Sequence, residues 1–292
     1  MTTTEHRPSH FITTADQRRI AVDVHGPADA PVVLLLSAAP GSRRFDPNPS
    51  VTASAGVRLV TLDRPGYGGS DPMPAGQPLT VTSAADDAAL VLEQLGVTEA
   101  GVAGWSAGGR VALALAARRP ELVTSVAVLA TPAPDEEVPW IGEPQRGMLA
   151  ELRRDLAGAP AVLAEMLAPM TADPAAAVEQ VCGGPADDAV LAEPGVRAGL
   201  VDMLSEAFRQ GAVGLAADLA SYTLHDWGFD PRAVGAPVRC WYGAQDSIVS
   251  PAHGAWWAEQ VADGSVTAVD GVGHLVIHRV WADVLAHLTA QR

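Results

Sequence analysis

The stretch that most constrains this chain is residues 104–108, which read Gly-Trp-Ser-Ala-Gly. They match the Gly-x-Ser-x-Gly pattern of a nucleophile elbow, a sharp turn that presents a serine between a strand and a helix. A short apolar run, residues 100–103, precedes the turn, and an Ala- and Leu-rich helical run follows it and ends at Pro120. We therefore expect Ser106 at a helix start, where free backbone N–H groups favour a developing oxyanion.

The pattern alone is a weak signal, because an ordinary Gly/Ser turn contains the same residues. Two positions are nonetheless restrictive: Gly104 and Gly108 lack the Cβ atoms that would collide with the adjacent strand and helix. A functional interpretation also needs a base and an acid elsewhere in the chain, since a serine hydroxyl is a poor nucleophile without them.

The charged residues exclude several classes of enzyme and partner. The 292-residue chain has 34 acidic residues and 19 basic residues other than His, and all 19 are Arg. Without lysine there is no Schiff-base lysine, no P-loop lysine and no Ser-Lys dyad. The net charge of −15 argues against nucleic acid and anionic membrane surfaces as partners. We expect a small-molecule substrate, and the oligomeric state stays open.

Cysteine usage and the N-terminus predict a cytoplasmic protein. Cys182 and Cys240 give neither a disulfide framework nor a Cys-x-x-Cys motif. Residues 1–8 are polar and lack the apolar region of a signal peptide, and no apolar run approaches the length of a membrane span.

Strands alternate with helices along most of the chain, which predicts an α/β fold with a mostly parallel eight-stranded sheet and helices on both faces. We expect strands at residues 11–14, 18–25, 32–36, 57–62, 100–103, 123–130, 238–242 and 265–269. A further helix is expected to open at Thr82, with Asp86 and Asp87 in its first turn.

The composition and the spacing of apolar residues change between the sixth and seventh expected strands. Residues 135–232 are Ala-rich, follow helical spacing and contain no convincing strand. We therefore expect an all-helical cap over this segment, inserted between two parts of one core, residues 1–134 and 233–292. The helices expected within the cap include residues 151–156, 161–167 and 196–208.

Two side chains are positioned to serve Ser106. Asp246 and His274 each follow a predicted strand, and the carboxyl ends of the strands meet at one crevice in folds of this type. The chain order Ser, Asp, His is that of one known triad arrangement. Asp135 and Asp270 are alternative acids, and Asp246 has the alternative role of a helix cap.

The other histidines carry weaker predictions. His274 and His278 are four residues apart, but no acidic third ligand follows at zinc spacing, so we predict no metal site. His253 and His225 are expected at the surface or in the cap, where His225 has the option of facing the substrate. Trp105 is expected either in the pocket wall or in the core.

Four motifs in order resemble those of the α/β-hydrolase-fold serine hydrolases with a helical cap, in the esterase or proline-iminopeptidase branch. They lie at residues 63–70, 104–109, 242–246 and 271–274, and the resemblance covers nearly the whole chain. It implies Ser106 as nucleophile, His274 as general base and then acid, Asp246 as orienting acid, and no cofactor. The glycines at 63–70 are accordingly not read as a nucleotide site, since Pro65 and the missing helix argue against one.

One motif departs from this family. After its first long buried strand the family usually has His-Gly, whereas residues 37–41 here read Ser-Ala-Ala-Pro-Gly. The backbone N–H groups of Ala39 and Ala107 are the expected oxyanion donors, and Pro40 joins Trp105 as an expected pocket residue. Ala in place of Gly restricts the backbone, and the missing histidine removes a group that braces the loop.

The leading functional hypothesis is hydrolysis of an ester, lactone or thioester of a small, largely apolar substrate through an acyl-enzyme. The haloalkane dehalogenases and epoxide hydrolases of this fold use an aspartate at the elbow, so Ser106 argues against those two reactions. An aminopeptidase of the proline-iminopeptidase type is the alternative enzyme, with a substrate amine held by cap carboxylates from among Glu136, Glu137 and Glu143. A non-hydrolytic binding or cyclase scaffold of the same fold remains a third hypothesis.

Overall fold

One sheet organises the molecule in the computed structural model, which describes residues 7–181 and 184–290. Its eight strands, counted over these residues, lie in the order β1-β2-β4-β3-β5-β6-β7-β8. β1 and β2 run antiparallel to each other, β2 runs antiparallel to β4, and the remaining neighbours are parallel. The strands are β1 His10–Thr13, β2 Arg19–His25, β3 Val32–Leu36, β4 Arg58–Leu62, β5 Ala100–Trp105, β6 Val123–Leu129, β7 Val238–Gly243 and β8 Gly264–Val269. The predicted fold class is confirmed.

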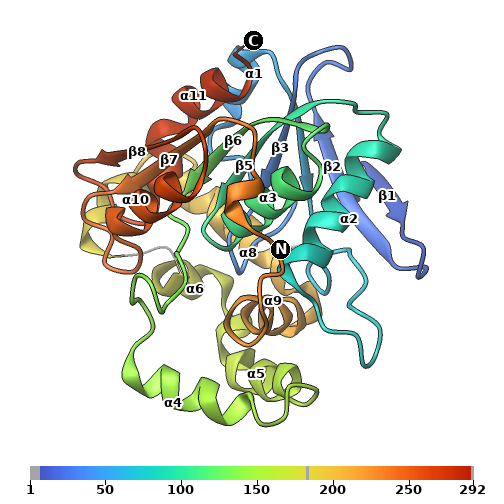
Figure 1. Cartoon of the computed structure of the whole chain (residues 1–292), viewed down its shortest axis with the longest axis vertical. Coiled ribbons are helices and arrows are strands. Elements are labelled where there is room, and N and C mark those ends of the chain that lie inside the picture. The colour runs from blue at the N-terminus through green and yellow to red at the C-terminus, as the bar shows by residue number, and fades with distance from the viewer. Residues whose placement is uncertain (1–6, 182–183, 291–292) are drawn as a thin grey trace.

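Helices cover both faces of this sheet, as Figure 1 shows. The helices that follow the strands of the core are α1 Pro49–Ala55, α2 Val81–Gln94, α3 Ala107–Arg118, α10 Pro251–Gln260 and α11 Val276–Leu288. Alternate residues of β3 point into two separate apolar cores, since successive strand side chains face opposite sides. Leu34 and Leu36 pack in the core with α2, α3 and α10, whereas Val33 and Leu35 pack in the core with α11 and the cap helix α8.

Between β6 and β7 the described chain forms only helices and turns. The α-helices are α4 Glu143–Leu152, α5 Ala159–Leu167, α6 Pro174–Val181, α7 Asp188–Leu191, α8 Val196–Ala207 and α9 Val213–Thr223. The 3-10 helices are η1 Ala168–Ala172, η2 Pro185–Asp187 and η3 Phe208–Gln210 here, and η4 Pro231–Ala233 before β7. In Figure 1, α4, α5 and α9 lie below the sheet. We keep the name cap for residues 135–232.

Two local helix predictions are wrong. The helix predicted over residues 151–156 does not form, because α4 ends at Leu152: Leu152 is buried while Leu156 is 40% exposed, so nothing favours another turn. Helix α2 begins at Val81 rather than Thr82, because Thr80 and Ser83 cap it reciprocally. Its two acids are therefore not in the first turn.

These two acids pair with arginines instead. Asp87 is buried against Arg18 through two hydrogen bonds of 2.9 Å, which tie α2 to the N-terminal hairpin. Asp86 pairs at the surface with Arg118 of α3.

The structure describes only part of the residues behind the predictions on the N-terminus and on the cysteines. Residues 1–6 and Cys182 lie outside the described residues, and Cys240 is a buried free thiol. None of the helices in the part of the chain described here combines the length and the apolar character needed to cross a bilayer.

Helix α11 is fastened to the loop before α1 by a partly buried histidine. The Nδ1 of His278 donates a hydrogen bond to the carbonyl oxygen of Pro47 at 2.8 Å, and its ring meets Phe45 edge-on. Its Nε2 atom is buried and has no hydrogen-bond partner among the described residues. Burial lowers the pKa of His278 to about 4, so the imidazole is neutral in the folded protein at neutral pH.

We predict that this histidine makes the protein acid-sensitive. The unfolded chain takes up a proton near its ordinary pKa of about 6.5, whereas the folded protein does so only near 4. Stability is therefore lost as the pH falls through this window, by about 2 kcal/mol from this group between pH 7 and pH 5. His278→Gln keeps an N–H donor but does not titrate, so urea unfolding at the two pH values should show a smaller loss. An equal loss in both proteins would contradict this assignment.

Candidate active site

Ser106 occupies a strained turn between β5 and α3. Its φ of 54° and ψ of −119° lie in a region that side chains other than Gly rarely adopt. Its N–H donates to the carbonyl of Leu129 on β6 at 2.7 Å, which holds the turn against the sheet. A Cβ on Gly108 would lie 2.1 Å from the carbonyl oxygen of Leu36, and one on Gly104 would lie 2.4 Å from that of Gly108. The two glycines therefore allow the close packing on which this turn depends.

Asp246 and His274 contact each other as the sequence predicts. His274 Nδ1 lies 2.8 Å from Asp246 Oδ2, and both side chains are buried. The other carboxylate oxygen accepts the N–H groups of Ile248 and Val249. Burial opposes the charge of Asp246, but these hydrogen bonds hold its pKa below the ordinary value. An ionised Asp246 places the imidazole proton on Nδ1 and leaves Nε2 as the acceptor.

The alternative acids lie elsewhere. Asp135 accepts N–H groups of Trp140 and Ile141 and pairs with Arg146, so it serves the first loop of the cap. Asp270 is exposed. The prediction of a surface position for His253 is wrong: it is 2% exposed, and its Nδ1 accepts the N–H of Ala133 in the loop after β6.

Trp105 connects the loop of His274 to the elbow. Its Nε1 donates to the carbonyl oxygen of His274 at 3.1 Å, and the two ring centroids are 5.9 Å apart. The indole is fully buried and stacks on Phe45, so the structure places it in the core. His274 therefore lies beside the residue that precedes Ser106, although no hydrogen bond joins the Ser106 hydroxyl to the imidazole in the described structure.

The loop after β3, residues 37–41, is braced by an arginine that sequence analysis did not identify. Arg64 donates from Nη1 to the carbonyl oxygen of Ser37 at 2.7 Å and from Nη2 to that of Ala38 at 2.8 Å. Its Nε and Nη2 bind the carboxylate of Asp218 on α9. The signal was the position of Arg64 two residues after the end of β4, the neighbour of β3 in the sheet. This arginine braces the loop in which the expected histidine is missing.

Within this loop the expected oxyanion and pocket residues are adjacent. Ala39 is partly exposed, Pro40 is buried, and a cis peptide bond joins them. Ala107, the first residue of α3, is buried.

The next turn of this loop is also tied to the cap. The Ser42 hydroxyl donates to the carbonyl oxygen of Met203 on α8 at 2.8 Å. Arg43 is fully buried and pairs with Asp63 at 2.6 Å and with Glu206 of α8 at 2.5 Å. Burial raises the pKa of Asp63 to about 6. Two arginines next to the site, Arg43 and Arg64, thus form ion pairs with carboxylates of the cap.

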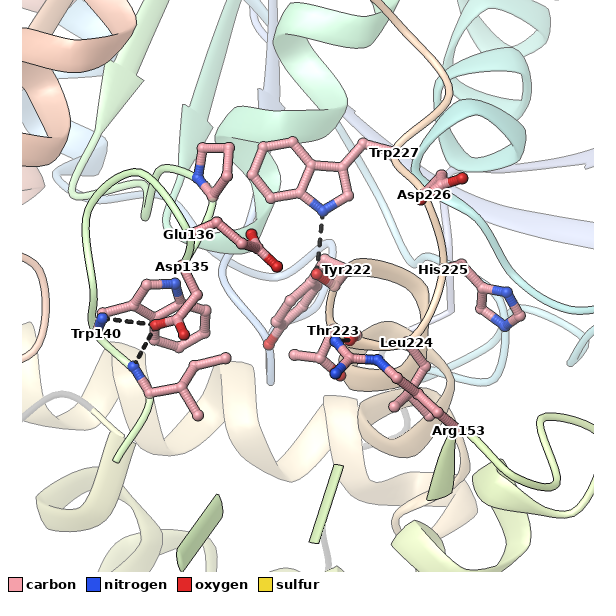
Figure 2. Close-up of a pocket in the computed structure, with 12 residues that line it drawn as sticks. Asp135, Glu136, Trp140, Arg153, Tyr222, Thr223, Leu224, His225, Asp226 and Trp227 are labelled. Carbon is pink, nitrogen blue, oxygen red and sulfur yellow. Dashed lines mark hydrogen bonds between the residues drawn. The ribbon is translucent and has the colours of Figure 1, made fainter. Parts of the chain in front are cut away.

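A cavity of about 420 Å³ opens between the first loop of the cap and the chain after α9. Figure 2 shows Trp140, Tyr222 and Trp227 around it, with Arg153 and His225 along one side. Behind these rings lies Arg110 of α3, which is 1% exposed and 4.6–5.7 Å from their three centroids. Burial lowers the pKa of Arg110 to about 10, so it stays charged at neutral pH, and the ring faces offset part of its desolvation.

The three glutamates proposed for an amine site differ in position. All three are exposed, and of them only Glu136 lines this cavity, whereas Glu143 lies beside Arg146. Across residues 7–181 and 184–290 no group of three or more His, Cys, Asp or Glu side chains is close enough to hold a metal ion.

A second hollow, of about 480 Å³, is mostly apolar. It lies between the Pro-rich loop before α2 and the cap helices α5 and α9. Its walls include Met73, Leu79, Leu156, Ala161, Val213 and Ala217. His225 borders both this hollow and the first cavity.

Known proteins share this sequence pattern and fold. A family model described as alpha/beta hydrolase fold matches residues 31–278. The chain is 30% identical to the pimeloyl-(acyl-carrier protein) methyl ester esterase of Chromobacterium violaceum over 216 residues, which are 71% of this chain and 72% of that protein. It is 36% identical to RutD of Caulobacter segnis over 121 residues, which are 40% of this chain and only 45% of RutD.

A solved structure shows the same fold. The enol-lactonase of Burkholderia xenovorans LB400 has a TM-score of 0.68 at 22% identity, over 95% of this chain and 100% of that one.

We predict that Arg64 and Asp218 are strongly coupled. Asp218→Asn leaves Arg64 buried without a counter-charge, and Arg64→Met leaves the carboxylate and two carbonyl groups unpaired, so each change should cost about 3–5 kcal/mol of unfolding free energy. The double variant should cost less than the sum by at least about 1 kcal/mol, as measured by urea denaturation. Asp86→Asn, in the exposed pair with Arg118, is the control and should cost under about 1 kcal/mol. Additive losses would contradict the coupling.

Proposed function

Because the chain belongs to the alpha/beta hydrolase fold family, we propose that it is a serine hydrolase that cleaves an ester, lactone or thioester through an acyl-enzyme. The observation that carries the proposal is the 2.8 Å contact between Asp246 and His274. The imidazole lies beside Trp105, which precedes a serine held at φ 54°. A buried carboxylate bound to Nδ1 leaves Nε2 free to take a proton, which is what a serine nucleophile needs.

In the proposed reaction His274 Nε2 takes the proton of the Ser106 hydroxyl while Oγ attacks the carbonyl carbon of the substrate. The tetrahedral intermediate then expels its alkoxide or thiolate, which leaves with the proton from His274. A water molecule repeats the sequence on the acyl-enzyme and releases the acid. The hydrogen bond between Ser106 and His274 forms in the substrate complex, as catalytic contacts often do.

The negative oxygen of the intermediate is proposed to bind the N–H groups of Ala39 and Ala107. The second donor lies at the start of α3, where the helix dipole also favours negative charge. The first lies in the loop whose carbonyl groups are bound by Arg64, so the loop stays fixed without the expected histidine.

The second hollow is mostly apolar, which supports a small, largely apolar substrate, and its lining does not include Ser106, Asp246 or His274. Ester and lactone chemistry is supported by the names of two similar proteins, a methyl ester esterase and an enol-lactonase. We propose that the cap, residues 135–232, encloses the substrate and excludes water during acyl transfer.

An aminopeptidase of the proline-iminopeptidase type is a second candidate, because Glu136 borders an aromatic cavity that would suit a substrate ammonium group. Arg110 behind the same rings argues against it, since a buried cation repels a second one. A binding or cyclase scaffold would need neither the strained Ser106 nor the Asp246–His274 pair.

We predict that Ser106→Ala lowers kcat for p-nitrophenyl butyrate at least about 10³-fold, because the nucleophile is lost. A fluorophosphonate probe should label the wild-type protein at Ser106, as read by mass spectrometry, and should not label the variant. Ser250→Ala, at an exposed serine, is the matched control and should behave as wild type. A folded wild-type protein that neither reacts with the probe nor hydrolyses any ester would favour the scaffold hypothesis.

The two enzyme hypotheses are separated by leaving group. We expect kcat/KM for p-nitrophenyl esters to exceed that for proline p-nitroanilide by at least about 100-fold, a difference of about 2.7 kcal/mol in transition-state stabilisation. Glu136→Gln should leave ester hydrolysis unchanged. Faster hydrolysis of the anilide, lost in Glu136→Gln, would identify an aminopeptidase instead.

A further inference from the structure

A buried carboxylate of the cap binds the backbone on both sides of His274. Asp187, the last residue of η2, is 2% exposed. Its Oδ1 accepts the N–H of Gly273 at 2.8 Å, and both of its oxygens lie 3.3 Å from the N–H of Leu275. One side chain of the cap therefore fixes the peptide groups that flank the imidazole.

The residue at 273 permits this approach. A Cβ on Gly273 would lie 2.8 Å from Asp187 Oδ2, closer than such contacts are found. A buried carboxylate needs hydrogen-bond donors or a cation, and here the donors belong to the His274 loop. No arginine pairs with Asp187 in the described chain.

The carboxylate also lies close enough to interact with the imidazole. Burial raises the pKa of Asp187, and a protonated His274 lowers it. Two charged groups thus face His274 among the described residues: Asp246 at Nδ1, from the loop after β7, and Asp187 from the cap. The neighbouring Trp105 is uncharged.

We propose that Asp187 is a positioning residue for His274. It holds the base in place through the two flanking N–H groups, and its negative charge favours the imidazolium that forms when Ser106 loses its proton. This inference rests on the proposed function of His274. It makes the cap part of the catalytic machinery in addition to its role as a cover.

Three variants separate the two parts of this role. Asp187→Ala removes the acceptor and the charge, whereas Asp187→Asn keeps an acceptor oxygen and removes only the charge. Asp188→Asn is the matched control, since this neighbour is exposed. Each is assayed with p-nitrophenyl butyrate from pH 5 to 9, and melting temperature and amide hydrogen exchange are recorded for the same samples.

We expect kcat to fall about 10- to 100-fold in Asp187→Ala, as a misplaced base would cause, with KM changed less than threefold. Asp187→Asn should recover part of this loss, and the acid limb of its kcat/KM profile should move to lower pH because the imidazolium has lost a neighbouring negative charge. Amides of Gly273 and Leu275 should exchange faster in Asp187→Ala than in Asp188→Asn.

The outcomes distinguish this inference from the proposed function. Labelling of Ser106 at the wild-type rate in both Asp187 variants would overturn the positioning role and leave the hydrolase proposal intact. A wild-type protein without any esterase activity would overturn the hydrolase proposal. Hydrogen exchange still reads the contact in that case, and unchanged protection of Gly273 and Leu275 would overturn the inference as well.

Discussion

The geometry of the site depends on the hydrogen bonds made by the guanidinium of Arg64. It is fully buried, and its donors are divided between two carbonyl groups of the loop after β3 and the carboxylate of Asp218. A buried cation without such partners would be strongly unfavourable. The loop is therefore held in one conformation, and this conformation persists only while α9 supplies the counter-charge. The position of the proposed donor Ala39 thus depends on a residue of the cap.

The same arrangement recurs along the interface of cap and core. The buried acids of residues 135–232 within the described chain are Asp187, Glu206 and Asp218. They reach, respectively, the loop of His274, Arg43 next to the loop after β3, and Arg64. Each joins a cap helix to a segment beside Ser106. Since buried charges require particular partners at particular positions, these contacts fix the orientation of the cap more strictly than apolar packing alone.

The sequence predicts those parts of the fold and of the site that depend on local residue patterns. The sheet, the turn at Ser106 and the meeting of Asp246 with His274 follow from strand periodicity, from the glycines and from the convergence of strand ends. The pairing of Arg64 with Asp218 joins residues 154 positions apart, and nothing in either neighbourhood identifies the partner. Helix α9, the burial of His253 and the end of α4 likewise depend on which surfaces meet in the fold, and propensity alone does not decide this.

These contacts also determine which part of the cap can separate from the core at low cost. Lifting α8 or α9 would break the pairs Arg43–Glu206 and Arg64–Asp218, and Arg64 would lose its carboxylate partner. Helices α4 and α5 are held instead by an apolar cluster with α9 that includes Leu149, Leu163 and Leu224. Separating apolar surfaces costs only in proportion to the area exposed. Both cavities border this side of the cap, where apolar contacts rather than buried ion pairs hold α4 and α5.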